Sequence, residues 1–365
     1  MLKRIILVTL VVSAILACSS SDDSNSGNNS SDTYNRTAML TNIADNIIIP
    51  GYQNLSTDLS TLVDSKNAFV ANVNQTNLET LRTNWFNAYQ SFQAVQMFQI
   101  GKAEEILFEE QMNIYPTNTT DIENNIANGN YDLSSVNNND AVGFPAVDYM
   151  LYGVADNDAA ILTTLSNANY SNYLSDLIDR MQTLTNTVLT DWTSGYRDNY
   201  ITNTANVASG AVNQTLNAYV FYYEKRLRAD KVGIPAGVFS STPLPSKVEV
   251  LYKEDNSRTL LLEALNAVQD VFNGKAINSN IEGESYKNYL IALDRNDLAE
   301  VINDRFDAAR TKIEALNTNL KTQVETDNTK MTEAYDALQL AVVSLKSDML
   351  SAFNVSVSYV DADGD

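Results

Sequence analysis

Residues 331–352 read MTEAYDALQLAVVSLKSDMLSA, and their apolar side chains recur in a regular alternation of four- and three-residue steps. Because an α-helix completes a turn about every 3.6 residues, this spacing places those side chains on one face of a helix. The stripe consists of Met331, Tyr335, Leu338, Val342, Leu345, Met349 and Ala352. We therefore predict a long amphipathic helix that packs this face into a bundle of helices.

Four further stretches have the same spacing of apolar side chains. The first two run through Leu78, Leu81, Trp85, Ala88, Phe92 and Val95, and through Tyr173, Leu177, Met181, Leu184 and Val188. The other two run through Val212, Leu216, Tyr219, Tyr223 and Leu227, and through Leu298, Ile302, Phe306, Ala309, Ile313 and Leu316. Strand signals are scarce, and the best is residues 353–360, where polar and apolar side chains alternate. The sequence thus predicts an all-α fold with a short C-terminal strand.

Turn-forming residues interrupt the helical pattern and indicate where the fold divides. The break at residues 193–195 separates a first helical bundle, predicted over 36–192, from a second, predicted over 193–365. Residues 233–255 contain three prolines and form a long excursion within the second bundle. Loops of that length are often functional, and bundles place ligand sites between facing helices.

The N-terminus predicts an envelope protein. An apolar run follows Lys3 and Arg4 and ends just before Cys18, the only cysteine of the chain. A charged start, a short apolar core and a small residue before the cleavage point are typical of a secretory signal peptide, here residues 1–17. Because the cysteine follows Ala17 directly, the segment resembles a bacterial lipobox, and we predict that Cys18 becomes the lipidated N-terminus.

Residues 18–35 are predicted to be a disordered linker, since residues 19–33 hold no apolar side chain to bury. The lipid would anchor the protein to the outer membrane without crossing it. Asp22 and Asp23 resemble the acidic sorting signal of surface lipoproteins in the Bacteroidetes. The periplasmic and the surface-exposed locations both stay open at this point.

Composition excludes several classes of chemistry. The chain has no histidine, and after lipidation of Cys18 it would have no free thiol, so a Ser-His-Asp triad and the usual zinc site are excluded. We expect no catalytic residue, no resident metal and no zinc. The 24 basic side chains stand against 45 acidic ones, a net charge of −21, which argues against a nucleic-acid partner. We expect a monomer.

Residues 143–153, GFPAVDYMLYG, resemble the signature of the imelysin family, the insulin-cleaving membrane protease group. That signature has the pattern Gly-x-His-x-x-Glu. Gly143 matches the glycine, Pro145 stands at the histidine, and Asp148 stands at the glutamate. Four other stretches support the resemblance, namely residues 85–92, 115–116, 223–235 and 361–365. The chain is thereby identified as a member with a degenerate signature.

The resemblance implies two four-helix-bundle-like halves related by duplication, with the signature in the cleft between them. It also implies an envelope location and a link to iron uptake. Peptidase activity does not carry over, because Pro145 can neither bind a metal nor transfer a proton. We therefore expect a non-catalytic binding component in iron or haem acquisition, beside an outer-membrane receptor. The alternatives are a metallopeptidase with a carboxylate-only site and an adhesion or scaffold lipoprotein.

The candidate cleft residues are Gly143, Pro145, Asp148, Tyr149, Arg228 and Lys231. Two interpretations of Asp148 stay open: it is a partly buried acid satisfied by tyrosine hydroxyls or an arginine, or it lines a ligand cleft. A carboxylate among apolar and aromatic side chains needs donors. The segment 224–231 carries the densest supply of cations, so we expect Arg228 or Lys231 to meet Asp148 across the cleft.

Overall fold

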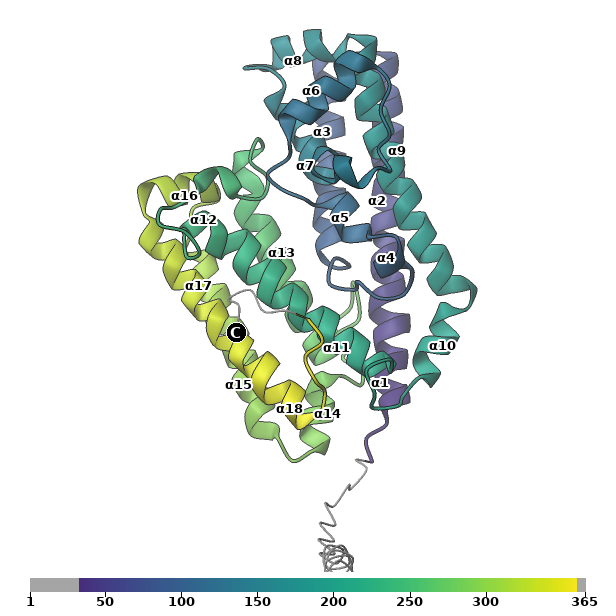
Figure 1. The fold of residues 1–365 in the computed structure, drawn as a ribbon, viewed down its shortest axis with the longest axis vertical. Coiled ribbons are helices and arrows are strands. Elements are labelled where there is room, and N and C mark those ends of the chain that lie inside the picture. Colours follow the sequence, from purple (N-terminus) through teal and green to yellow (C-terminus); the bar gives the residue numbers. More distant parts are fainter. Residues whose placement is uncertain (1–32, 360–365) are drawn as a thin grey trace, which may run out of the picture. The chain divides into compact units, whose positions relative to one another are not determined.

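The structure, a computed structural model, describes residues 33–359 (Figure 1). The predicted signal peptide, Cys18, most of the linker and the closing acidic run lie outside the described residues. Residues 34–359 belong to one compact unit. Within the described range no helix is both long and apolar enough to cross a membrane.

The chain is all-α, as predicted. The elements up to residue 202 are α1 (Arg36–Asn42), η2 (Ile43–Ile48), α2 (Ile49–Ala71), α3 (Gln75–Gln93), α4 (Lys102–Glu105), α5 (Phe108–Met112), α6 (Thr119–Asn128), η3 (Val136–Ala141), α7 (Gly143–Asp148), η4 (Tyr149–Gly153), α8 (Asp158–Leu165), α9 (Ala168–Asp191), η5 (Trp192–Tyr196) and α10 (Arg197–Thr202). Those that follow are α11 (Ala211–Phe221), η6 (Tyr222–Gly233), α12 (Ile234–Ala236), η7 (Pro245–Lys247), η8 (Glu254–Asn256), α13 (Ser257–Asn273), α14 (Tyr286–Ala292), α15 (Asn296–Glu314), α16 (Leu320–Thr326), α17 (Asn328–Val342), η9 (Val343–Met349) and α18 (Leu350–Ala352).

Two groups of long helices make up the fold. In the first, α2 packs against α3 and α9, and α7 packs on α3 and α9. In the second, α13, α15 and α17 pack together and η6 lies against α17 and α13. Helix α13 also packs on α3, which joins the groups (Figure 1). At the predicted break, 193–195, the backbone leaves helical geometry at Gly195, within η5.

The predicted apolar stripes form the core. All residues of the stripes on α3, α9, α11, η6 and α15 are buried, including the stripe members that lie just beyond the ends of α3 and α15. On the helix that runs through α17, η9 and α18, the stripe is buried from Met331 to Met349 and Ala352 is half-buried. Burial of these side chains supplies the hydrophobic stabilisation of the bundle.

The predicted C-terminal strand is wrong for the residues described. Residues 353–359 run along α11 as an unpaired tail. No strand lies beside them; instead the side chain of Asn217 donates to the Ser356 carbonyl at 3.1 Å and accepts from the Ser358 amide at 2.8 Å. Asn206 similarly donates to the Phe353 carbonyl at 3.2 Å. Side-chain amides thus satisfy a backbone that a sheet would otherwise pair.

Candidate functional site

The segment that resembles the family signature is buried, and its glycine is required by the backbone. Gly143 has φ of +76°, and a Cβ atom there would lie 2.2 Å from the carbonyl oxygen of Met112. Helix α7 starts at this residue. Pro145 is fully within the buried stretch Gly143–Asp148. The tight contact fixes α7 against the end of α5.

Gly143→Ala is expected to lower the free energy of unfolding by at least about 3 kcal/mol, from left-handed strain together with the clash on Met112. Gly129→Ala is the matched control, because Gly129 also has positive φ, +62°, but its Cβ would meet nothing within 4 Å. The control is expected to cost only about 1–2 kcal/mol. Urea unfolding of both variants measures the difference, and equal costs would contradict the assigned contact.

Asp148 is 1% exposed, and both of its carboxylate oxygens accept hydrogen bonds from backbone amides. The Tyr252 N–H donates to one oxygen and the Lys253 N–H to the other, each at 2.9 Å. Burial raises the pKa of this carboxyl to about 7, against the two backbone hydrogen bonds, which lower it. The acid at the signature position therefore fastens the end of the long 233–255 excursion to α7.

The aromatic side chains around α7 hold it in place. The indole N–H of Trp85 donates to the Phe144 carbonyl at 3.3 Å, and the Phe144 ring stacks on Tyr89 with centroids 4.4 Å apart. Tyr149, half-buried, donates its hydroxyl to Glu123 at 2.7 Å and packs its ring on Tyr252. Each of these contacts is with protein, so this face of α7 is filled.

Neither predicted cation contacts Asp148, so that expectation is wrong. Arg228 points toward α17, where it donates to the Tyr335 hydroxyl at 2.5 Å and to the side chain of Gln339. Lys231 points toward α3 and the excursion, where it donates to Gln93 at 2.9 Å and pairs with Glu249. The physical reason is that the excursion delivers both a carboxylate for Lys231 and backbone donors for Asp148.

Lys231 lies at the centre of a buried polar group that we call the Lys231 cluster: Tyr89, Gln93, Asn113, Lys231 and Glu249. Lys231 is 2% exposed and Glu249 is 3% exposed. One oxygen of Glu249 accepts from the Tyr89 hydroxyl at 3.1 Å and from the Asn113 amide at 2.9 Å, and its other oxygen meets Lys231. The single hydroxyl hydrogen of Tyr89 is shared between Glu249 and the side-chain oxygen of Asn113. The cluster thus ties α3, the end of α5, η6 and the excursion together.

Two buried tyrosines lie near the Lys231 cluster but form no hydrogen bond with it. The hydroxyls of Tyr115 and Tyr222 have no hydrogen-bond partner in the described structure. Burial raises the pKa of both phenols well above the usual value, and the charge of Glu249 adds to that rise. They are neutral donors at any physiological pH. Near Glu249 there are therefore two buried hydroxyl groups that could still form a hydrogen bond.

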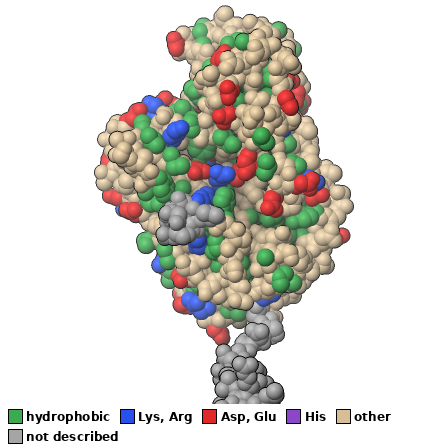
Figure 2. All heavy atoms as spheres, viewed as in Figure 1, with side chains coloured by type: hydrophobic (Ala, Val, Ile, Leu, Met, Phe, Trp, Pro, Cys, Tyr) green, Lys and Arg blue, Asp and Glu red, His purple; other side chains and the backbone are tan. Residues whose placement is uncertain are grey.

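A second ion pair also links η6 to α5. Arg226 of η6 lies with its Nε 2.6 Å from Glu109 of α5, and also pairs with Asp230 at 3.0 Å. The side chain of Glu109 is buried and accepts from Gln96 at 2.9 Å. Figure 2 shows acidic and basic side chains side by side over this junction of η6 and α5. Among the described residues, no group of three His, Cys, Asp or Glu is arranged to hold a metal.

Sequence reasoning missed Glu249 and Asn113, the residues that give the Lys231 cluster its partners. Glu249 lies between Val248 and Val250, which are both buried, in a segment without helical periodicity. An acidic residue between two apolar ones in a long excursion is the signal that points to it. The backbone donors of Tyr252 and Lys253 cannot be identified from the sequence, because every residue except proline carries a backbone N–H.

The chain matches one protein-family model and is similar in structure to solved proteins. The family model described as imelysin, peptidase M75, matches residues 48–349. A protein provisionally named iron-regulated protein A precursor, from Parabacteroides distasonis ATCC 8503, has a similar structure with a TM-score of 0.72 at 16% identity, covering 87% of this chain and 95% of that one. An imelysin-like protein from Psychrobacter arcticum 273-4 has a TM-score of 0.69 at 17% identity, covering 89% and 97%. These likenesses show the fold alone, and no curated protein matches the sequence.

Proposed function

Because this chain belongs to the imelysin family, we propose that it is a lipid-anchored, non-catalytic binding component of iron or haem acquisition in the cell envelope. The link to iron rests on the family resemblance and on the name of the Parabacteroides protein, an iron-regulated protein A precursor. The envelope location rests on the sequence around Cys18. An outer-membrane receptor for iron or haem is the partner that this role requires.

The observation that carries the non-catalytic part is the bonding of Asp148. A general base or metal ligand needs a lone pair that substrate or metal can reach. Asp148 is 1% exposed and each of its oxygens accepts a hydrogen bond from a backbone amide, while Pro145 occupies the position of the family's histidine. The residues of the signature thus support the excursion that carries Glu249. In this proposal they position a binding surface and transfer no proton.

Purified protein tests this role with haem, ferric citrate and zinc as probes. Saturable binding of haem or of the ferric chelate, together with slower growth of a deletion strain under iron limitation, is the expected result. Absence of both would contradict the role in iron acquisition and favour the scaffold alternative. A parallel assay adds zinc, cobalt or manganese with casein, and no hydrolysis is expected. Metal-dependent turnover that disappears in Asp148→Ala would favour the metallopeptidase alternative.

The anchor has its own test. Cys18→Ser removes the acceptor of the lipid, so this variant is expected to leave the membrane fraction and the detergent phase, or to retain its signal peptide. Ser19→Ala is the matched control, because it changes a neighbouring polar side chain and leaves Cys18 in place. If processed Cys18→Ser still partitions into detergent like the control, the lipid anchor is excluded.

A further inference from the structure

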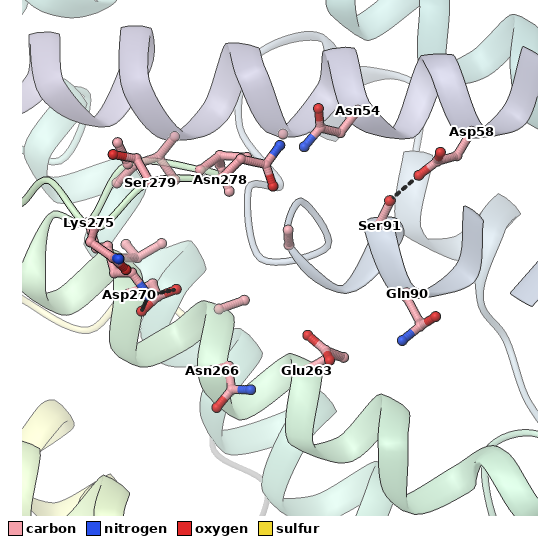
Figure 3. A pocket seen from close by; sticks show the side chains of 18 of the residues that line it. Asn54, Asp58, Gln90, Ser91, Glu263, Asn266, Asp270, Lys275, Asn278 and Ser279 are labelled. Carbon is pink, nitrogen blue, oxygen red and sulfur yellow. Dashed lines mark hydrogen bonds and ion pairs between the residues drawn. The ribbon is translucent and has the colours of Figure 1, made fainter. Parts of the chain in front are cut away.

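A polar hollow lies between α2 and α3 on one side and α13 on the other (Figure 3). Its volume is about 690 Å³, within the roughly 300–1,000 Å³ of small-molecule pockets, and it is open to solvent. Asn54 and Asp58 reach into it from α2, Gln90 and Ser91 from α3, and Glu263 from α13. Neither Asp148 nor any member of the Lys231 cluster lines it. It is therefore a different place from the site described above.

The end wall of the hollow is preformed. The Ile277 amide donates to the Asn46 carbonyl of η2 at 2.9 Å. The side chain of Asn42 adds hydrogen bonds to the carbonyls of Gly274, at 2.9 Å, and Glu284, at 3.0 Å. These bonds pin the segment 274–284 onto the first bundle. A ligand would thus meet a wall that needs no ordering on binding.

Three carboxylates line the hollow: Asp58 on α2, and Glu263 and Asp270 on α13. Asp58 accepts from Ser91, and Asp270 pairs with Lys275 at 3.3 Å. Glu263 makes no hydrogen bond or ion pair with any described residue. Burial raises the pKa of Glu263, and the charge of Asp270 adds to that rise. With one lysine against three acids, the lining carries an unbalanced negative charge that a bound cation would relieve.

The neutral part of the lining consists of amides. Five amide side chains make no hydrogen bond within the described residues: Asn54, Asn87, Gln90, Asn278 and Asn280. They offer donors and acceptors that only solvent or a ligand can use. No aromatic ring lines the hollow, so it has no platform for stacking a sugar or a porphyrin. The three acids are too dispersed to form a metal site.

We propose that this hollow binds a small organic cation with two or more ammonium groups. Glu263 and Asp270 lie seven residues apart on α13, which places them on one face of the helix about 10 Å apart. Asp58 faces them from α2 across the hollow (Figure 3). A linear diamine or triamine can therefore set its ammonium groups against Glu263 and its neighbours while the amides bond the remaining N–H groups. The proposal is independent of the role in iron acquisition.

Titration calorimetry of the purified protein with spermidine tests this assignment. The wild type is expected to bind spermidine saturably, and Glu263→Gln, which keeps the shape and removes the charge, to bind it roughly tenfold more weakly or worse. Glu300→Gln is the matched control, since it makes the same charge change at an exposed position of α15. It is expected to bind like the wild type.

Three results would overturn the proposal. The first is absence of saturable spermidine binding by the wild type. The second is an equal loss in Glu263→Gln and Glu300→Gln, which would indicate a diffuse effect of net charge. The third is binding of the uncharged polyol sorbitol as tight as that of spermidine. Thermal melts of both variants accompany the titrations, so that loss of binding is not confused with loss of fold.

Discussion

Lys231→Met is expected to lower the free energy of unfolding by about 3–5 kcal/mol, because it leaves the carboxylate of Glu249 buried without its cation. Lys231 and Glu249 are each almost fully buried, so water cannot replace the missing partner. The neutral donors Tyr89 and Asn113 stay in place and compensate only in part. Urea unfolding at neutral pH, followed by circular dichroism, measures the loss.

Lys225→Met is the matched control for this change. Lys225 belongs to the same element, η6, is half-buried and has no ion pair in the described structure. Its replacement is expected to change the free energy of unfolding by no more than about 0.5 kcal/mol. The double variant Lys231→Met with Glu249→Leu should recover much of the loss, since removing both charges removes the unpaired one. A Lys231→Met variant as stable as the control would refute the assigned ion pair.

Asp148 is expected to give this protein an unusual dependence of stability on pH. The folded pKa is about 7 and the ordinary value is 3.8, so between these values the folded state holds a proton that the unfolded state has lost. The contribution of Asp148 to stability is then complete below about pH 4 and is lost as pH rises to about 7. The difference between the folded and the unfolded pKa corresponds to a change on the order of 4 kcal/mol in the free energy of unfolding.

Asp148→Asn isolates this contribution, because the amide cannot titrate. The free energy of unfolding of the wild type minus that of Asp148→Asn is expected to fall between pH 4.5 and pH 7.5. Asp198→Asn serves as the control, since Asp198 is exposed, and its difference from the wild type should change little over the same range. A wild-type advantage that grows with pH would mean that the two backbone hydrogen bonds outweigh burial.

The helical core was predictable because it depends on the spacing of apolar side chains. The stripe from Met331 to Met349 and the stripe around Trp85 are buried as predicted, since helix periodicity needs only local sequence. The prediction of a C-terminal strand failed because a strand depends on more than local sequence. Alternation in residues 353–359 is local, but a strand also needs a neighbour, and the structure supplies Asn217 there instead.

The need of Asp148 for hydrogen-bond donors was predictable from its apolar and aromatic surroundings, in which it is buried. The identity of those donors was not, because Tyr252 and Lys253 act through backbone amides, which every residue except proline carries. Lys231 was expected to serve Asp148, yet Glu249 is a closer partner that only the path of the 233–255 excursion brings near.

Hydrogen exchange at the amides of Tyr252 and Lys253 tests most directly whether the signature acid holds the excursion in place. In the wild type both amides are expected to exchange slowly, since each is bonded to a buried carboxylate. In Asp148→Ala they should exchange at least about tenfold faster, while amides in the middle of α9 keep their protection relative to global stability. Equal exchange of Tyr252 and Lys253 in the two proteins would contradict the structural role assigned to Asp148.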